Sequence, residues 1–346
     1  MSKLALVMIA RNEERAIKRA LDSVRPYVDE MIVVDTGSTD NTITCAQNVG
    51  AKVFEFTWCD DFSKARNTAL DHSNADWNFI LDADEVLTDG GETLKSIASL
   101  KSDFVGAISI DSGYGASGEE QHVRNWLVRL LPSHIRFSGR IHEQPIHTLP
   151  IKHLDIHCHH DGYLPALRNT KKGRNEFLLK AEIQNFPNDP YLHYQLGKEM
   201  EVDQDFTLAV KSYQTSLSLL DKSFENWHRD LVIRCLFCMK KIKNFEHAMQ
   251  LASQWQHVLD PIPDFHFVLG DLCLDMAIDK PADAEAILPL IESHWLRCLE
   301  IGEKPEIDGC VKGRGSILAA HNLHAFYTSL GMDEHAALYQ SYKIRE

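Results

Sequence analysis

Short apolar runs alternate with amphipathic segments over the first eighty residues, and this pattern predicts an α/β sheet. The run LALVMIA at residues 4–10 is continuous, as in a buried parallel strand, and apolar residues then recur at helical spacing from Ile17 to Val24. The same cycle predicts further strands at 31–34, 52–56 and 78–81, and helices through Ile43 and Ala46 and over 62–71. Strand and helix in alternation require right-handed crossovers, so we expect a mostly parallel sheet with helices on both faces.

The rhythm changes between residues 104 and 163, where short strand-like runs are separated by Gly and Pro. These runs are VGAISI at 105–110, NWLVRLL at 125–131, IRFSG at 135–139 and the alternating HLDIHCH at 153–159. They predict an antiparallel layer added to the same domain. After Tyr163 the strand signals stop.

Residues 170–346 have an almost wholly helical pattern that contains three similar Leu-Gly pairs. A small residue in a following helix accompanies each pair: Leu196-Gly197 with Ala209, Leu269-Gly270 with Ala284, and Leu330-Gly331 with Ala336. The first two pairs are 73 residues apart, about twice the 34-residue period of tetratricopeptide repeats. We therefore predict degenerate helical hairpins of that type, with domains at 1–168 and 169–346. An unrelated helical bundle is the alternative, because no repeat matches a full consensus.

Length and composition fit two folded domains: the chain has 346 residues, of which 44% are hydrophobic and 25% charged. The formal net charge of -14, with no long Lys/Arg run, disfavours nucleic acid as a partner, and a nucleotide diphosphate would need a local cation. The eight cysteines are scattered, and the single CxxC, Cys235 to Cys238, has no second pair, so we expect buried thiols in a reducing compartment. The apolar N-terminal run is too short for a signal peptide, and no stretch is long enough for a transmembrane segment, so the expected location is cytoplasmic.

Acidic residues follow two of the predicted strands directly. In Ile80-Leu81-Asp82-Ala83-Asp84-Glu85, the spacing sends Asp82 and Asp84 to the same side of an extended backbone, at the sheet edge where ligands bind. Mg²⁺ or Mn²⁺ prefers such oxygen ligands and commonly shares them with substrate phosphates. Asp35 ends the other strand and could accept a hydrogen bond from a base imide N–H, whereas Ser38 to Asn41 are explained by helix capping.

Four segments in order, MIARNEE (8–14), VDEMIVVDTGSTDNT (28–42), FSKARNTAL (62–70) and WNFILDADEVL (77–87), resemble the family 2 glycosyltransferases with the GT-A fold. The chain is similar to bacterial members that join the transferase to tetratricopeptide repeats, including peptide S-glycosyltransferases of the sublancin type. The resemblance implies a Rossmann-like mixed sheet followed by an all-α domain. It also implies substrate contacts by Ala10, Arg11, Glu13, Asp35, Arg66, Asn67 and Asp82, and metal binding by Asp82 and Asp84. Arg66 has a structural alternative, a salt bridge to Asp61 or Asp82.

A second segment, RLLPSHIRFSGRIHE at 129–143, resembles the family's acceptor-side motif, which makes Glu143 the candidate base. A carboxylate there would take the acceptor proton as the glycosidic bond forms. The alternative is a structural pairing of Glu143 with Arg140 or His142. The sequence His160-Asp161-Gly162-Tyr163 resembles the family's H-x-GY ending, which implies that His160 completes the metal shell.

These features predict an inverting, metal-dependent glycosyltransferase that uses a nucleotide diphosphate sugar, with a UDP-sugar as the expected donor. The acceptor is a peptide side chain or a cell-surface saccharide, and the helical domain presents it or forms a homodimer. A non-catalytic repeat scaffold with a vestigial GT-A domain is the main alternative. A nucleotidyltransferase is disfavoured because ARNEERA, after the first strand, lacks the glycines of a phosphate loop.

Overall fold

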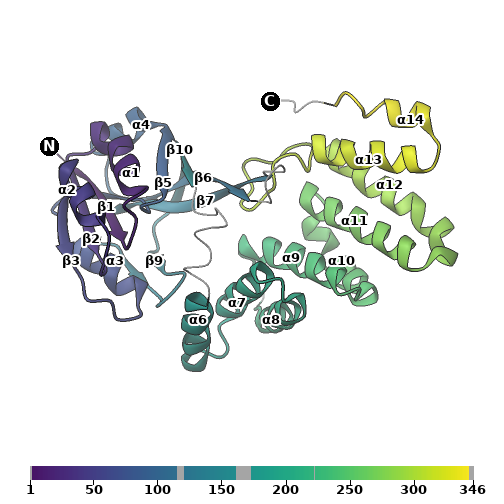
Figure 1. Ribbon diagram of the computed structural model, residues 1–346, viewed down its shortest axis with the longest axis horizontal. Coiled ribbons are helices and arrows are strands. Elements are labelled where there is room, and N and C mark those ends of the chain that lie inside the picture. Colours follow the sequence, from purple (N-terminus) through teal and green to yellow (C-terminus); the bar gives the residue numbers. More distant parts are fainter. Residues whose placement is uncertain (1, 115–120, 161–172, 222, 343–346) are drawn as a thin grey trace. The chain divides into compact units, whose positions relative to one another are not determined.

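The computed structural model of the protein describes residues 2–114, 121–160, 173–221 and 223–342. The chain divides into two compact units, Met1–Leu178 and Leu179–Glu346 (Figure 1). The boundary predicted between residues 168 and 169 falls outside the described residues and stays a prediction.

Parallel strands form one half of an eight-stranded sheet with the order β3-β2-β1-β4-β7-β6-β10-β5. They are β1 (Leu4–Ala10), β2 (Glu30–Asp35), β3 (Lys52–Glu55) and β4 (Trp77–Ile80). β1 lies between β2 and β4 and is parallel to both, and β3 continues the sheet beyond β2. The connections contain α1 (Ile17–Val24), the 3-10 helix η1 (Arg25–Tyr27), α2 (Thr42–Asn48) and α3 (Phe62–Asp71). The predicted strand and helix alternation is confirmed.

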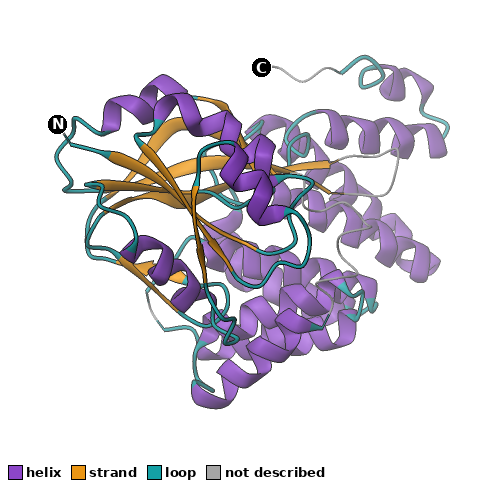
Figure 2. Ribbon diagram, turned by 60° about the vertical axis from the view of Figure 1, so that its left-hand side comes forward, coloured by secondary structure: helices purple, strands orange, loops and turns teal. Residues whose placement is uncertain are grey.

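Alternate residues of β1 point to opposite faces of this sheet, and each face is covered by helices (Figure 2). Leu6 belongs to a buried cluster that includes Leu21 of α1, whereas Val7 belongs to a second cluster that includes Leu70 of α3. A strand buried on both faces needs a continuous apolar run, which explains the sequence LALVMIA.

The second half of the N-terminal unit extends the same sheet, so the predicted antiparallel strands are present but do not form an added layer. Its strands are β5 (Glu85–Asp89), β6 (Val105–Tyr114), β7 (Gln121–Pro132) and β10 (Ile151–His160), and α4 (Gly91–Ile97) follows β5. β7 pairs antiparallel with both β4 and β6, β10 runs parallel to β6, and β5 closes the edge antiparallel to β10. A small separate sheet contains β8 (Arg136–Ser138) and β9 (Gln144–Ile146).

The sequence pattern did not reveal β5 or α4. The segment EVLTD of β5 has only two apolar residues and directly follows the acidic motif, so it reads as a loop. Its pairing with β10 makes it a strand, because β10 supplies the hydrogen-bonding edge that a five-residue segment cannot provide for itself.

The C-terminal unit is built from helices, as predicted. They are α6 (Arg174–Asn185), which begins before the division between the units, α7 (Pro190–Val202), α8 (Phe206–Leu219), α9 (Trp227–Lys241), α10 (Phe245–Leu259), α11 (Pro263–Asp279), η2 (Pro281–Asp283), α12 (Ala284–Ile301), α13 (Ile317–Ser329) and α14 (Asp333–Ala337). The helices α7, α9 and α11 begin three successive hairpins and start 37 and 36 residues apart. This spacing is close to the period of tetratricopeptide repeats.

Two of the three Leu-Gly pairs have the same structural role. A Cβ added at Gly197 would lie 2.3 Å from the ring of Tyr213, and one added at Gly270 would lie 2.4 Å from Trp295 Nε1. Each glycine therefore allows the second helix of its hairpin to approach closely. The expected equivalence of Gly331 is wrong: this glycine follows the end of α13 with φ of +70° and belongs to the turn.

In the part of the chain that the structure describes, no helix is both long and apolar enough to cross a bilayer.

Candidate active site

The carboxyl ends of β1, β2 and β4 meet at one edge of the sheet, where the chain reverses its strand order. Ala10 at the end of β1 is paired in register with Asp35 at the end of β2, and Asp82 follows β4 on the other side of β1. Crevices of this kind are the usual ligand-binding positions of open α/β sheets. The predicted acids of both strand ends therefore lie at the same edge.

Asp35 is buried, and one of its carboxylate oxygens has no partner. Oδ2 accepts hydrogen bonds from the backbone N–H groups of Gly37 at 2.9 Å and Ser38 at 2.8 Å. Oδ1 is buried without a hydrogen-bond partner in the described part of the protein, and the residue is only 2% exposed. A buried acceptor of this kind costs free energy unless a ligand donates to it.

The loop after β1 is held against the loop after β2. Asn12 donates its N–H to Ser38 Oγ at 2.9 Å, and its side-chain oxygen accepts the N–H of Thr39 at 2.8 Å. Glu13 donates its N–H to Thr42 Oγ1 at 2.7 Å and is half-buried, whereas Arg11 is exposed. The structure thus brings the predicted base-side residues beside Asp35.

Asp82 lies between two arginines that come from different elements. Arg66 of α3 donates from Nη2 to Oδ1 at 2.8 Å, and Arg129 of β7 donates from Nη2 to Oδ2 at 2.7 Å. Burial raises the pKa of Asp82, but the charges of Arg129 and Arg66 outweigh it and hold this pKa far below its usual range. Asp82 is therefore an anion whose two oxygens are both engaged.

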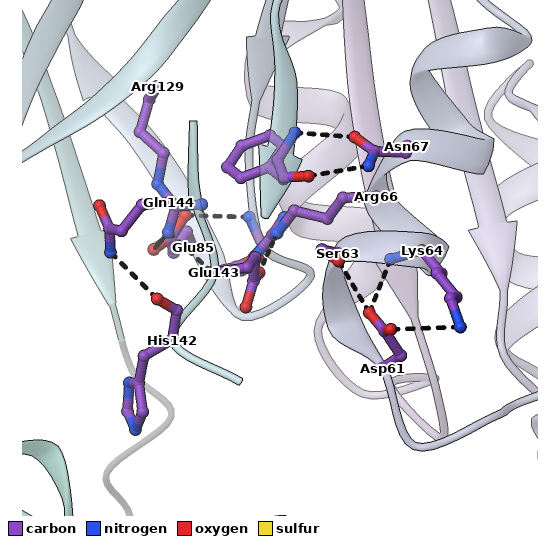
Figure 3. A network of polar contacts seen from close by, with 12 residues as sticks. Asp61, Ser63, Lys64, Arg66, Asn67, Glu85, Arg129, His142, Glu143 and Gln144 are labelled. Carbon is purple, nitrogen blue, oxygen red and sulfur yellow. Dashed lines mark hydrogen bonds and ion pairs between the residues drawn. The ribbon is translucent and has the colours of Figure 1, made fainter. Parts of the chain in front are cut away.

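Arg129 also donates a hydrogen bond to Glu85, so Arg129, Glu85 and Asp82 belong to one polar network, part of which Figure 3 shows. The same Nη2 donates to Glu85 Oε1 at 2.8 Å, while Glu85 Oε2 accepts the backbone N–H of Asp82 at 2.9 Å. Burial raises the pKa of Glu85 although Arg129 opposes it. Sequence reasoning assigned no role to Arg129 and considered Glu85 only as an alternative to Glu143 as the base. A signal for Arg129 was present, because it is the only charged residue in the apolar run NWLVRLL.

Glu143 reaches this network through Arg66. Its Oε1 accepts a hydrogen bond from Arg66 Nε, and its side chain is 8% exposed. Asn67, the next residue of α3, binds the backbone of Phe137 in both directions, donating to O at 2.9 Å and accepting from N at 2.8 Å. In Figure 3, Arg66 and Asn67 both extend from α3 toward this segment. The amide of Asn67 thus positions β8, and its substrate contact stays a prediction.

Asp84 and His160 come together from distant parts of the chain. Asp84 Oδ2 lies 3.3 Å from His160 Nε2, and His160 Nδ1 lies 3.5 Å from Ser112 Oγ. Antiparallel pairing places His160 opposite Glu85, directly beside Asp84. Burial lowers the pKa of His160, but Asp84, Glu85 and Asp82 together raise it above its ordinary value. The motif residues 161–163 lie outside the described residues.

The predicted metal ligands are only partly assembled. Asp84 and His160 present an oxygen and a nitrogen at a separation that suits two ligands of one divalent cation. Both oxygens of Asp82 face arginines instead, and the described residues contain no group of three or more His, Cys, Asp or Glu residues arranged to hold a metal. Asp84 and His160 therefore fit the predicted role, and Asp82 fits it only after an arginine has moved.

An open α/β sheet with acids at the ends of β2 and β4 gives the N-terminal unit an architecture of the GT-A kind. Residues 5–164 match the model of Glycosyl transferase family 2.

Two relatives are similar to the chain, one described as a glycosyltransferase and the other as a repeat-containing protein. The SPbeta prophage-derived glycosyltransferase SunS of Bacillus subtilis is 28% identical over 238 residues, which are 64% of this chain and 53% of SunS. A TPR repeat-containing protein of Synechococcus elongatus is 48% identical over 87 residues, 25% of this chain and 22% of that protein. The chain thus spans about half of SunS and a smaller part of the second relative. The predicted resemblance to repeat-bearing glycosyltransferases is confirmed.

Among solved structures, glucosyl-3-phosphoglycerate synthase from Mycobacterium tuberculosis, in complex with Mn²⁺ and UDP-glucose, is 23% identical with a TM-score of 0.27. The match covers 32% of this chain and 44% of that one.

Proposed function

We propose that this protein is an inverting, metal-dependent glycosyltransferase that uses a UDP-sugar. The observation that carries the proposal is that Asp35, with its unsatisfied oxygen, and the pair Asp84 and His160 follow strands of one sheet edge within a family 2 domain. A vestigial domain has no physical reason to keep a buried, unsatisfied acceptor.

In this proposal Asp35 accepts a hydrogen bond from the imide N–H of uracil. Asp84 and His160 hold Mg²⁺ or Mn²⁺, which when bound neutralises charge on the departing diphosphate. Glu143 receives the acceptor proton, and a single displacement at the anomeric carbon inverts its configuration. Arg11 and Glu13 line the base side through the two joined loops. Ala10 contributes backbone only, because its carbonyl accepts from Thr36 N–H at 2.9 Å.

The acceptor is a peptide side chain or a saccharide, which the helical unit presents; dimerisation is the other role considered for that unit. The nucleotide site belongs to residues 1–168, so a soluble fragment of that length should bind UDP and lose acceptor recognition. We place the protein in the cytoplasm, in keeping with cysteines that are unpaired and mostly buried.

A non-catalytic scaffold is the competing function, and the engagement of Asp82 and Glu143 by arginines favours it. The two functions differ in a thermal-shift experiment with UDP-glucose, UDP-N-acetylglucosamine and GDP-mannose, each with Mn²⁺ and with EDTA. A donor at about 100 times its dissociation constant stabilises the folded state by about 2.7 kcal/mol, whereas a scaffold shows no Mn²⁺-dependent shift. Release of UDP in the presence of acceptor extracts then measures transfer.

A further inference from the structure

One guanidinium group connects the predicted metal ligand Asp82 with the predicted base Glu143. Arg66 donates from Nη2 to Asp82 Oδ1 at 2.8 Å. It also donates from Nε to Glu143 Oε1, a contact that Figure 3 shows. The side chains of Arg66 and Glu143 are 11% and 8% exposed, whereas that of Asp82 is 33% exposed. An incoming ligand can therefore reach the Asp82 side of this bridge more easily than the Glu143 side.

We propose that Arg66 is an exchangeable counter-ion that occupies Glu143 until the donor and its cation arrive at Asp82. This inference rests on the proposed function and assigns Arg66 as a positioning residue for Glu143. While Arg66 donates to Oε1, that oxygen cannot accept a proton from the acceptor, and Oε2 is the one oxygen of Glu143 left for it. Arg66 therefore couples two steps, filling of the donor site and exposure of Oε1.

The direction of the exchange follows from charge. A guanidinium does not lose its proton in proteins, so a nearly buried Arg66 always needs an anionic partner. A divalent cation held beside Asp82 would compete with Arg66 for the carboxylate and repel it, and the diphosphate that comes with the cation would offer new oxygens. The planar fork of arginine matches such oxygen pairs.

Arg129 provides the contrast that makes Arg66 the mobile partner. Arg129 is 10% exposed and its second partner, Glu85, is 5% exposed and fixed to the backbone of Asp82. Arg129 therefore stays within the network when Asp82 turns toward a cation. The second partner of Arg66, Glu143, lies in the segment after β8 and, unlike Glu85, has no hydrogen bond to Asp82 among the described residues, so nothing there keeps Arg66 at Asp82 when that side chain turns.

The first test measures Mn²⁺ binding to the full chain by electron paramagnetic resonance, without nucleotide. Arg66→Lys keeps the charge but cannot bridge both carboxylates, so it should bind Mn²⁺ about tenfold more tightly than the unmodified protein. Arg136→Gln is the control, because Arg136 forms an exposed ion pair with Asp71 rather than with Asp82 or Glu143. Equal affinity of Arg66→Lys and the unmodified protein would overturn the exchange. Absence of Mn²⁺ binding from every form, together with no Mn²⁺-dependent donor shift, would instead reject the proposed function and with it this inference.

The second test observes the bond to Glu143 directly by nuclear magnetic resonance of ¹⁵N-arginine-labelled protein. The Nε–H signal that is absent from Arg66→Lys belongs to Arg66, and Glu143→Gln should shift it because a charge-assisted bond is lost. Adding Mg²⁺ and UDP to the unmodified protein should move the signal away from its ligand-free position as the bond to Glu143 breaks. A signal that stays in place while UDP binds would show that Arg66 keeps Glu143 and would refute the proposal.

Discussion

Asp84 and His160 are 76 positions apart in the sequence, yet Asp84 Oδ2 lies 3.3 Å from His160 Nε2. The contact exists because β5 and β10 pair at the edge of the sheet, with Glu85 opposite His160. If these groups are metal ligands, each should contribute to metal affinity in the absence of any reaction.

Asp84→Asn and His160→Ala should each weaken Mn²⁺ binding by about 10-fold or more, since each removes one ligand from the cation. Asn nearly preserves the volume of Asp, so the folded domain should persist, as far-ultraviolet circular dichroism would verify. Asp103→Asn serves as the control, because Asp103 is exposed and pairs only loosely with Lys101 at 3.7 Å. Unchanged Mn²⁺ affinity in Asp84→Asn would remove Asp84 from the metal site.

Asp35→Asn should weaken UDP binding by about 10- to 100-fold, equivalent to the ~1–3 kcal/mol cost of an unsatisfied buried group. The amide oxygen can still accept from Gly37 and Ser38, which directs the NH₂ group to the place of Oδ1. A donor would then face the donating N–H of uracil. Isothermal titration of UDP and CDP checks this. Cytosine has a ring acceptor in place of the imide N–H of uracil, so the affinity for CDP should fall less than that for UDP. Equal losses for both nucleotides would contradict base recognition by Asp35.

Glu143→Gln should lower the rate of sugar transfer by ~10²-fold or more while donor affinity persists, because the amide keeps the shape but cannot take a proton. Single-turnover rates and UDP affinity measured side by side separate the two effects. A thiol acceptor would reduce the loss, since a cysteine with a pKa of about 8.5 is already partly thiolate. Transfer at the unmodified rate with a hydroxyl acceptor would exclude Glu143 as the base.

Gly197→Ala should destabilise the helical unit by about 1–3 kcal/mol through overpacking. The new Cβ would lie 2.3 Å from the ring of Tyr213, which is itself buried. Lys211→Ala on the exposed surface of α8 is the comparison and should change stability little. Urea unfolding followed by circular dichroism measures the difference, and a fully stable Gly197→Ala would mean that the hairpin can open without cost.

Acid should destabilise the helical unit through His266 and His294, whose Nδ1 atoms lie 3.1 Å apart. Burial lowers the pKa of both, that of His294 to about 4, where the charge of His266 contributes as well. Asp260 opposes the shift in His266, and Arg297 reinforces it. Between the ordinary histidine pKa and about pH 4, the unfolded chain binds protons that the folded chain does not, so the free energy of unfolding falls as pH falls.

The loss should be on the order of 2 kcal/mol between pH 7 and pH 4.5 and should shrink in His294→Gln. His257→Gln, at an exposed position of α10, should retain the full loss. Urea titrations at several pH values measure both variants. An equal pH dependence in His294→Gln and the unmodified protein would show that the pair is not responsible.

The local pattern of hydrophobic and polar residues was sufficient to predict the strands and helices of residues 4–80. A doubly buried strand must be apolar throughout, and an amphipathic helix must repeat its apolar positions, so each element leaves its own signal. The acids Asp35, Asp82 and Asp84 were recognisable for the same reason, because they directly follow such strands. The close approach at Gly197 and Gly270 also has a local signal, since only glycine lacks the Cβ that would collide.

Only tertiary pairing decided how the later strands join the sheet and which distant residues meet in the candidate site. The strands β6, β7 and β10 could have formed their own layer, and only their hydrogen-bonding partners put them into the main sheet. That pairing makes β5 a strand and brings His160 to Asp84. Likewise, Arg66 and Arg129 meet at Asp82 from α3 and β7. Because a salt bridge depends on atoms within about 4 Å and these residues are far apart in sequence, only the folded sheet could select Arg66, rather than Arg140 or His142, as the ion-pair partner of Glu143.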